Sequence, residues 1–428
     1  MTDLVEPYEI RDPVHGFIRL NQLEWDVINH PVFQRLRRIK QLAWTDMVYP
    51  GTTHTRFEHS LGVMHVASRL FDSLRRKSGE ILRHEYDYED DQLDRQRRII
   101  RLAALLHDIG HGPFSHAAEE LFPLNDATGK QFDHEDYSKA ALSSGLGELI
   151  EGHKQARDSG IRITDISAIF SSPAKSARDL VWKDLVSGQM DADRMDYLLR
   201  DSYYAGVQYG HYDLNRVVSC LRLCPDPETE GHYIGVDEDG IHAVEGLLIA
   251  RFMMFTQLYF HKTRSIYDYH LTECLKELLR DVGGHFPLPT NISDYLAWDD
   301  WRVLGAIADS RGGEHGDILR NRTHYRRVFS TAEVADSSEF ERAVLIQREL
   351  SELGCVARDA EKSWYKSGPD EIKVLRSSDG GERSVPLATM SSIVRGLVKV
   401  NQRRLYVPLA HKEAAEQIVK QWYGETAK

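Results

Sequence analysis

Cysteine is scarce in this sequence. The 428 residues include only Cys220, Cys224, Cys274 and Cys355, which do not have the spacing of a disulfide framework. Cys220 and Cys224 could form half of a metal site, but no second pair exists, so we interpret them as small core residues. Disulfide frameworks belong to oxidising compartments, so this cysteine usage favours a cytoplasmic protein.

Long apolar runs are also missing. No stretch approaches the roughly 20 apolar residues that cross a bilayer. The N-terminus, MTDLVEPYEI, has no basic region followed by an apolar one, as a signal peptide would. With 41% hydrophobic and 28% charged residues, the chain is expected to be soluble and globular, without membrane association.

The chain also lacks an excess of positive charge. The formal net charge is −12, so the chain lacks the global field with which nonspecific nucleic-acid binders attract phosphates. Strong nucleic-acid binding is therefore not expected. A small anionic substrate remains compatible, because a few local arginines and lysines can hold one. Histidine, by contrast, is plentiful: the chain has 20, clustered in its first third.

Apolar periodicity predicts a mainly α fold. Helical spacing extends over residues 59–77, 97–110, 190–207 and 241–282, the last as one or two long helices. Residues 8–20 look like two short strands around a turn. Strand-like segments lie at 371–378, 383–387 and 403–409, and 412–424 is an amphipathic closing helix.

Glycine and proline in GGHFPLPTNIS (283–293) interrupt the helical pattern. We therefore expect three regions. These are residues 1–50 with strands and helices, 51–290 as a helical catalytic body, and 291–428 as a smaller α+β C-terminal lobe.

Polar residues follow an apolar helix directly in ALLHDIGHGPFSHAAEEL (104–121). The pair His107-Asp108 ends the apolar run, while His59 lies in HTRFEHSLG and Asp193 in DADRMD. Imidazole nitrogens and carboxylate oxygens suit divalent cations, and two of each leave coordination positions open for water and substrate. A metal would also satisfy polar groups that are costly to bury. The alternative is that these side chains only hydrogen-bond to the backbone.

Three more histidines favour the metal interpretation. His111, His116 and His134 lie near the pair along the chain and beside acidic residues. Imidazole–carboxylate pairs tune a general acid near neutral pH.

Two further patterns indicate an anionic, hydroxylated substrate. Asp193, Tyr197 and Asp201 recur at i, i+4 and i+8, so they share one helix face. Arg56 lies three residues before His59, where its guanidinium could meet a phosphate.

These residues resemble the H…HD…D signature of the HD superfamily of metal-dependent phosphohydrolases. The blocks DPVHGFIRL, FQRLRRIKQL, YPGTTHTRFEHSLGV, LLHDIGHGPFSH, HE and DADRMDYLLRDS look like those of the SAM-and-HD-domain deoxynucleoside triphosphate triphosphohydrolases. They follow one another in the right order over roughly residues 8 to 210. A lone HD pair is common, whereas this ordered set is specific; the C-terminal third resembles the family only in general pattern.

The resemblance implies an HD phosphohydrolase domain in residues 51–290. It implies hydrolysis of a dNTP to a deoxynucleoside and inorganic triphosphate. The divalent metal ion, which could be Mn, Fe, Mg, Zn, Co or Ni, would be held by His59, His107, Asp108 and Asp193.

The resemblance also assigns roles around the metal. The catalytic group would be His111, which protonates the leaving 5′ oxygen, together with Glu119 and His134, and His116 would contact phosphate. The substrate would be bound by Arg56 and Arg194 at the triphosphate, Gln41 and Asp201 at the sugar 3′-hydroxyl, and Leu42 and Tyr197 against the deoxyribose. Arg194 departs conservatively from the lysine of the animal members.

Regulation is implied as well, within residues 1–50. Members of this family form homo-oligomers, tetramers or hexamers, around activating nucleotides. Gln34 and Arg37 match activator-contacting positions. Asn29 stands where the animal enzymes carry an acid that accepts hydrogen bonds from guanine, so a strict guanine preference is not implied. The alternative is that Gln34 and Arg37 only pack a helix at a subunit interface.

Two other classes of function stay open. A phosphodiesterase or pyrophosphohydrolase acting on a cyclic or signalling nucleotide could use the same metal set, because fold does not fix substrate. A non-catalytic nucleotide sensor is the second class. A degenerate metal set would indicate that class, but all four ligands are present here.

Overall fold

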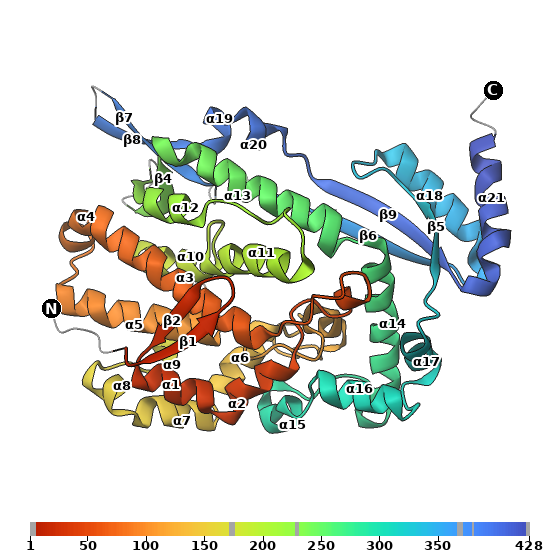
Figure 1. Ribbon diagram of the computed structural model, residues 1–428, viewed down its shortest axis with the longest axis horizontal. Helices are drawn as coiled ribbons and strands as arrows, with labels where there is room; N and C mark the ends of the chain where they lie inside the picture. The colour runs from red at the N-terminus through yellow and green to blue at the C-terminus, as the bar shows by residue number, and fades with distance from the viewer. Residues whose placement is uncertain (1–5, 171–175, 227–230, 366–370, 379–380, 425–428) are drawn as a thin grey trace.

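The computed structural model describes residues 6–170, 176–226, 231–365, 371–378 and 381–424 (Figure 1). It begins with an antiparallel hairpin of β1 (Tyr8–Asp12) and β2 (Gly16–Leu20), as expected from residues 8–20. Asp12 Oδ1 accepts hydrogen bonds from the backbone N–H groups of Val14 and His15, and Gly16 takes a positive φ of 79°. These contacts fix the turn of the hairpin.

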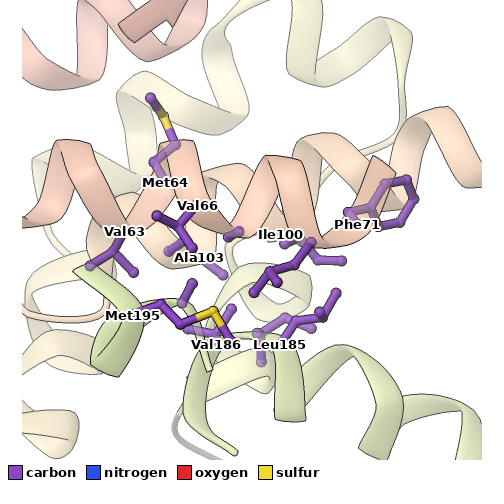
Figure 2. Close-up of a cluster of buried hydrophobic side chains, with 14 of the residues drawn as sticks. Val63, Met64, Val66, Phe71, Ile100, Ala103, Leu185, Val186 and Met195 are labelled. Carbon is purple, nitrogen blue, oxygen red and sulfur yellow. The ribbon is translucent and has the colours of Figure 1, made fainter. Parts of the chain in front are cut away.

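The fold is mainly helical, as predicted, around the adjacent helices α3 (Arg56–Lys77) and α5 (Asp90–Leu106). α10 (Ala177–Ser187) and α11 (Ala192–Ala205) pack against α3. Figure 2 shows buried side chains of the hydrophobic core around these helices, among which are Val63, Met64, Val66, Phe71, Ile100, Ala103, Leu185, Val186 and Met195. Burying each larger apolar side chain here stabilises the fold by about 1.5–3 kcal/mol.

The remaining α-helices before residue 290 lie around or beside this core (Figure 1). They are α1 (Gln22–Asn29), α2 (Pro31–Gln34), α4 (Gly79–His84), α6 (His134–Leu142), α7 (Gly145–Gly152), α8 (Lys154–Asp158), α9 (Ile163–Phe170), α12 (Leu214–Cys220), α13 (Ile241–Met254) and α14 (Lys262–Leu279).

The long apolar stretch after residue 240 forms two helices, α13 and α14, joined by a π-helical turn at Phe255–Tyr259. By length and composition, the helix Glu238–Tyr259 is long and apolar enough to cross a membrane, although the sequence has no uninterrupted apolar run there. Half of that window is buried inside the molecule. It also includes the buried charged residues Glu245 and Arg251. These properties fit a core helix of a globular body.

Two sheets contain the other strands. One has the order β3 (Leu221–Pro225), β4 (His232–Asp237), β7 (Lys373–Ser378) and β8 (Gly381–Pro386), with β4 and β7 parallel. The other has the order β5 (Arg326–Ser330), β9 (Val400–Val407) and β6 (Val356–Lys362). The first sheet therefore crosses the boundary expected near residue 290.

The last third also supplies its own helices. They are α15 (Ile292–Leu296), α16 (Asp300–Ala308), α17 (Gly313–Asn321), α18 (Ser337–Glu349), α19 (Leu387–Met390), α20 (Ser392–Gly396) and α21 (Lys412–Gly424). α18 and α21 pack on the three-stranded sheet and form the smaller α+β region that was predicted (Figure 1). α17 instead packs against α14 of the helical body.

Candidate active site

The four predicted metal ligands converge where three helices begin or end. His59 lies in the first turns of α3, His107 and Asp108 directly follow α5, and Asp193 lies in the first turn of α11. His59 Nε2 is 2.9 Å from Asp193 Oδ1 and 3.5 Å from Asp108 Oδ2. His107 Nε2 is 3.2 Å from Asp108 Oδ1. Residues far apart in the sequence thus surround one point.

The hydrogen bonds of the two imidazoles leave the right nitrogens for a metal. His107 Nδ1 donates to the backbone oxygen of Ala104 at 2.8 Å, and His59 Nδ1 donates to Asp196 Oδ2 at 2.8 Å. Both Nε2 atoms are buried and make no hydrogen bond. Metal-binding histidines are commonly held in this way, with one nitrogen anchored and the other facing the ion. The donor set therefore fits a divalent cation.

The electrostatics of this cluster favour positive charge. Burial lowers the pKa of His59, but Asp193 and Asp196 outweigh burial and raise that pKa to about 10. At His107, burial also lowers the pKa, but Asp108 and Asp193 outweigh burial and raise it. Carboxylates that draw protons onto buried imidazoles will also attract a divalent cation.

Arg56 contacts this cluster. Its Nη1 donates to Asp108 Oδ2, and its Nε donates to Ser115 Oγ at 2.9 Å. The guanidinium expected to bind phosphate is therefore already held beside one metal ligand.

A second histidine group surrounds Glu119. Glu119 Oε1 accepts from His134 Nδ1 at 2.8 Å and from His116 Nδ1 at 3.0 Å, and lies 3.6 Å from His111 Nδ1. His111 Nε2 is 3.3 Å from Asp108 Oδ1, so the two histidine groups adjoin. The ligand atoms of this second group lie close enough together to hold a cation as well. The carboxylate therefore orients the imidazoles of His134 and His116.

Proton affinity differs within this second group. Burial, Arg56 and His134 keep the pKa of His111 well below its ordinary value. At His134, burial is outweighed by Glu119, and the pKa is raised. Without substrate, His134 therefore binds a proton more tightly than His111, the residue expected to be the acid.

The predicted sugar-binding residues lie together. Gln41 Oε1 is buried without a hydrogen bond. Asp201 Oδ1 bonds to His54 Nε2 at 2.8 Å, and its Oδ2 accepts from the Tyr259 hydroxyl at 2.6 Å. His54 and Tyr259 were not among the predicted residues. Tyr259 lies in the π-helical turn, a local distortion often found at functional sites, but no sequence pattern marked it.

One cavity of about 410 Å³ is lined by residues from each of these groups. The predicted residues that line it are Gln41, Leu42, Arg56, His107, Asp108, His111, His116, His134, Asp193, Arg194, Tyr197 and Asp201. Three cationic residues that were not predicted also line it, Arg251, Arg264 and Lys362. Lys362 ends β6, so the C-terminal region helps to enclose the cavity.

The three predicted activator residues are not among those that line this cavity. Asn29 Nδ2 donates to the backbone oxygen of Trp25 at 2.9 Å, and Gln34 Nε2 donates to that of Ile28 at 2.7 Å. Arg37 Nε donates to Gln34 Oε1 at 2.9 Å. The structure brings Gln34 and Arg37 into contact, and their role stays a prediction.

Comparison with known proteins gives two adjoining family matches. The HD domain matches residues 56–198, and the HD-associated region matches residues 212–362. The chain is 37% identical to the uncharacterized protein YwfO of Bacillus subtilis, over 95% of this chain and 93% of that protein.

Two proteins named as hydrolases are also similar. The deoxynucleoside triphosphate triphosphohydrolase SAMHD1 of Bos taurus is 30% identical over 68% of this chain, which spans about half of SAMHD1, 51%. The crystal structure of a phosphohydrolase from Bacteroides thetaiotaomicron matches with a TM-score of 0.68 and 26% identity, over 94% of this chain and 99% of that one.

Proposed function

Because the chain belongs to the HD-domain phosphohydrolase family, with an HD domain followed by an HD-associated region, we propose that it is a dNTP triphosphohydrolase. The observation that carries the proposal is the shared cavity. In it, the predicted metal ligands His107, Asp108 and Asp193 adjoin arginines that suit phosphate and an aspartate that suits a sugar hydroxyl. The reaction yields a deoxynucleoside and inorganic triphosphate.

Phosphate binding would fall to the arginines of the cavity. Arg56 and Arg194 are the predicted pair, and Arg251 adds a third guanidinium, mostly buried, at the same cavity. Guanidinium groups bind phosphate oxygens through charge-assisted, paired hydrogen bonds. A bound divalent cation would neutralise charge on the phosphoryl oxygens and lower the pKa of water.

The histidines around Glu119 would supply the proton that the leaving group needs. The 5′ oxygen of the sugar departs as an alkoxide unless an acid protonates it. Before substrate binds, the pKa of His111 is lowered by burial, Arg56 and His134, whereas Glu119, which accepts a hydrogen bond from His134, raises the pKa of His134. A triphosphate beside His111 stabilises its charged form, so substrate binding raises the pKa of His111 and prepares it as the acid.

The sugar would be recognised by the polar residues around Asp201. Asp201 is held on both oxygens by His54 and Tyr259, which fixes its carboxylate for a 3′-hydroxyl. Gln41 offers an unpartnered amide oxygen nearby in the same cavity. Leu42 and Tyr197 would pack against C2′, where a 2′-hydroxyl would clash.

Product analysis tests this proposal. The purified protein is incubated with each dNTP, alone and in pairs, with Mn²⁺ and with Mg²⁺. Deoxynucleoside and triphosphate in equal amounts support it. Pyrophosphate or a nucleoside monophosphate would instead identify another HD phosphohydrolase, and nucleotide binding without any turnover would identify a sensor.

A further inference from the structure

Asp196 links the metal ligand His59 to the N-terminal hairpin. It is fully buried, and its Oδ2 accepts from His59 Nδ1 at 2.8 Å. Its Oδ1 is 2.6 Å from His15 Nε2, in the turn after β1. His15 and Asp196 are not among the residues that line the cavity. Their effect on the reaction must therefore pass through His59.

Arg200 holds the same carboxylate from the other side. Its Nε and Nη2 donate to the two oxygens of Asp196 at 2.8 and 2.9 Å, and its Nη1 donates to Asp12 Oδ2 at 2.8 Å. Asp12 in turn fixes the backbone of His15 through the hairpin turn. Arg200, His15 and His59 therefore all contact the buried carboxylate of Asp196. Asp196 is thus a fixed acceptor.

Helix α3 makes room for this network. Gly62 lies one turn after His59, and a Cβ there would overlap Asp196 Oδ1 and Arg200 Nη2. Glycine inside a helix costs about 1 kcal/mol relative to alanine, so local propensity does not explain its presence. The close approach of the Asp196 carboxylate to α3 explains why a glycine stands here.

We propose that His15 and Asp196 are positioning residues for the metal: Asp196 holds His59 so that its Nε2 faces the cation, and His15 holds Asp196. His15 lies outside the segment that matches the HD domain, residues 56–198. Metal affinity therefore depends on the N-terminal hairpin. This inference rests on the metal site and not on the identity of the nucleotide.

Metal titration of the full chain tests the proposal. Protein stripped with a chelator is titrated with Mn²⁺, and cobalt-loaded protein gives a ligand-field spectrum that reports the geometry around the ion. Loss of a hydrogen bond that orients a metal-binding histidine weakens metal binding about 10–100-fold. We expect a weakening in this range for His15→Leu and for Asp196→Ala, with an altered cobalt spectrum. His15→Gln, which keeps an N–H donor, should retain most of the affinity.

His65→Leu is the matched control. The His65 ring is 5.2 Å from that of His15, but the histidines that bond to Asp196 are His15 and His59. It should change stability in chelator without changing Mn²⁺ affinity. Should His15→Leu not fold, His15→Asn, whose amide is too short to reach Asp196, gives the same test.

Mn²⁺ affinity within twofold of wild type in His15→Leu or His15→Asn would overturn the proposal. So would an equal loss of affinity in His65→Leu. The titration uses no nucleotide. A protein that fails to hydrolyse dNTPs but shows the expected loss of affinity would therefore refute the proposed function and leave this inference standing.

Discussion

The imidazole rings of His111 and His134 are stacked, with 4.0 Å between their centroids and 13° between their planes. Two imidazoles this close repel each other when both are charged, and they differ in proton affinity, with the pKa of His111 lowered and that of His134 raised. In the proposed reaction, this pair would pass a proton to the leaving group.

Replacing His111 tests its role as the acid. Because its Nε2 faces Asp108 but the metal cluster has its own ligands, His111→Ala should keep metal and substrate binding. It should lower kcat by about 100-fold or more, the contribution of a positioned acid. Metal content and kcat are measured beside His107→Ala, which should lose metal. Equal metal loss in the two variants would show that His111 is a ligand.

Removing a ligand carboxylate tests whether the metal is catalytic. Asp108 lies within 3.5 Å of both His59 Nε2 and His107 Nε2. We expect Asp108→Ala to lose both bound metal, by elemental analysis, and turnover. Glu120→Ala removes an acid with a 58% exposed side chain from the same segment and should change neither. Full activity of metal-free protein in chelator would contradict a catalytic metal.

The sugar pocket predicts discrimination against ribonucleotides. Leu42 is buried and lines the cavity beside Tyr197. Leu42→Gly opens space for a 2′-hydroxyl, so the ratio of kcat/KM for dATP over ATP should fall towards one. The wild-type ratio serves as the reference. A wild-type protein that hydrolyses ATP as fast as dATP would show that this pocket does not read the sugar.

A buried histidine pair outside the active site predicts acid sensitivity. His270 is fully buried, its Nδ1 is 2.8 Å from His315 Nδ1, and its Nε2 accepts from the Tyr325 N–H at 3.2 Å. The neutral ring therefore carries its proton on Nδ1, and a second proton would face the Tyr325 N–H. Burial, His315 and His324 lower the pKa of His270 from 6.5 to about 3.

Proton uptake at His270 links the stability of the fold to pH. Below pH 6.5 the unfolded chain takes up a proton at His270 and the folded chain does not, so stability present above pH 6.5 is lost towards pH 3. The slope is about 1.4 kcal/mol per pH unit for one histidine. In His270→Phe, urea unfolding between pH 6 and 4 should show a slope smaller by that amount, whereas His84→Gln at an exposed site should not. An unchanged slope in His270→Phe would refute the assignment.

The sequence predicted those parts of the site that contiguous motifs encode. His59, His107-Asp108 and Asp193 each mark a helix end, because an apolar period stops where polar residues begin. Their convergence needed only α3, α5 and α11 to pack together. The helical spacing of Asp193, Tyr197 and Asp201 likewise placed them on one face, and all three line the cavity.

The partners of those residues could not be predicted in this way. His54 and Asp201 are 147 positions apart, and His15 and Asp196 are 181 apart. No local period relates such residues, so only the tertiary packing reveals them. The same holds for the parallel pairing of β4 with β7, which joins two segments on either side of the expected domain boundary.

A second nucleotide is expected to bind at Gln34 and Arg37. Gln34 and Arg37 match activator-contacting positions of the resembled family, and Asn29 stands where its animal members carry an acid. Arg37 is exposed, and its guanidinium carbon lies 3.5 Å from the centroid of the Phe57 ring, with its Nε bonded to Gln34. The ring and the amide hold the guanidinium at the surface in a set direction, as a phosphate-binding group requires.

We expect a nucleotide bound there to favour an assembled, active form. A ligand that binds only the assembled state stabilises it by about 2.7 kcal/mol at 100 times its Kd. Mixed-nucleotide assays should therefore show activation by a second dNTP, and sedimentation should show a larger species when it is present. Arg37→Ala should lose both effects while keeping the metal. Arg19→Ala, which removes a 66% exposed arginine from the same N-terminal segment, should keep both. Hyperbolic kinetics with every single dNTP, and a size indifferent to all nucleotides and to Arg37→Ala, would instead leave these residues a packing role.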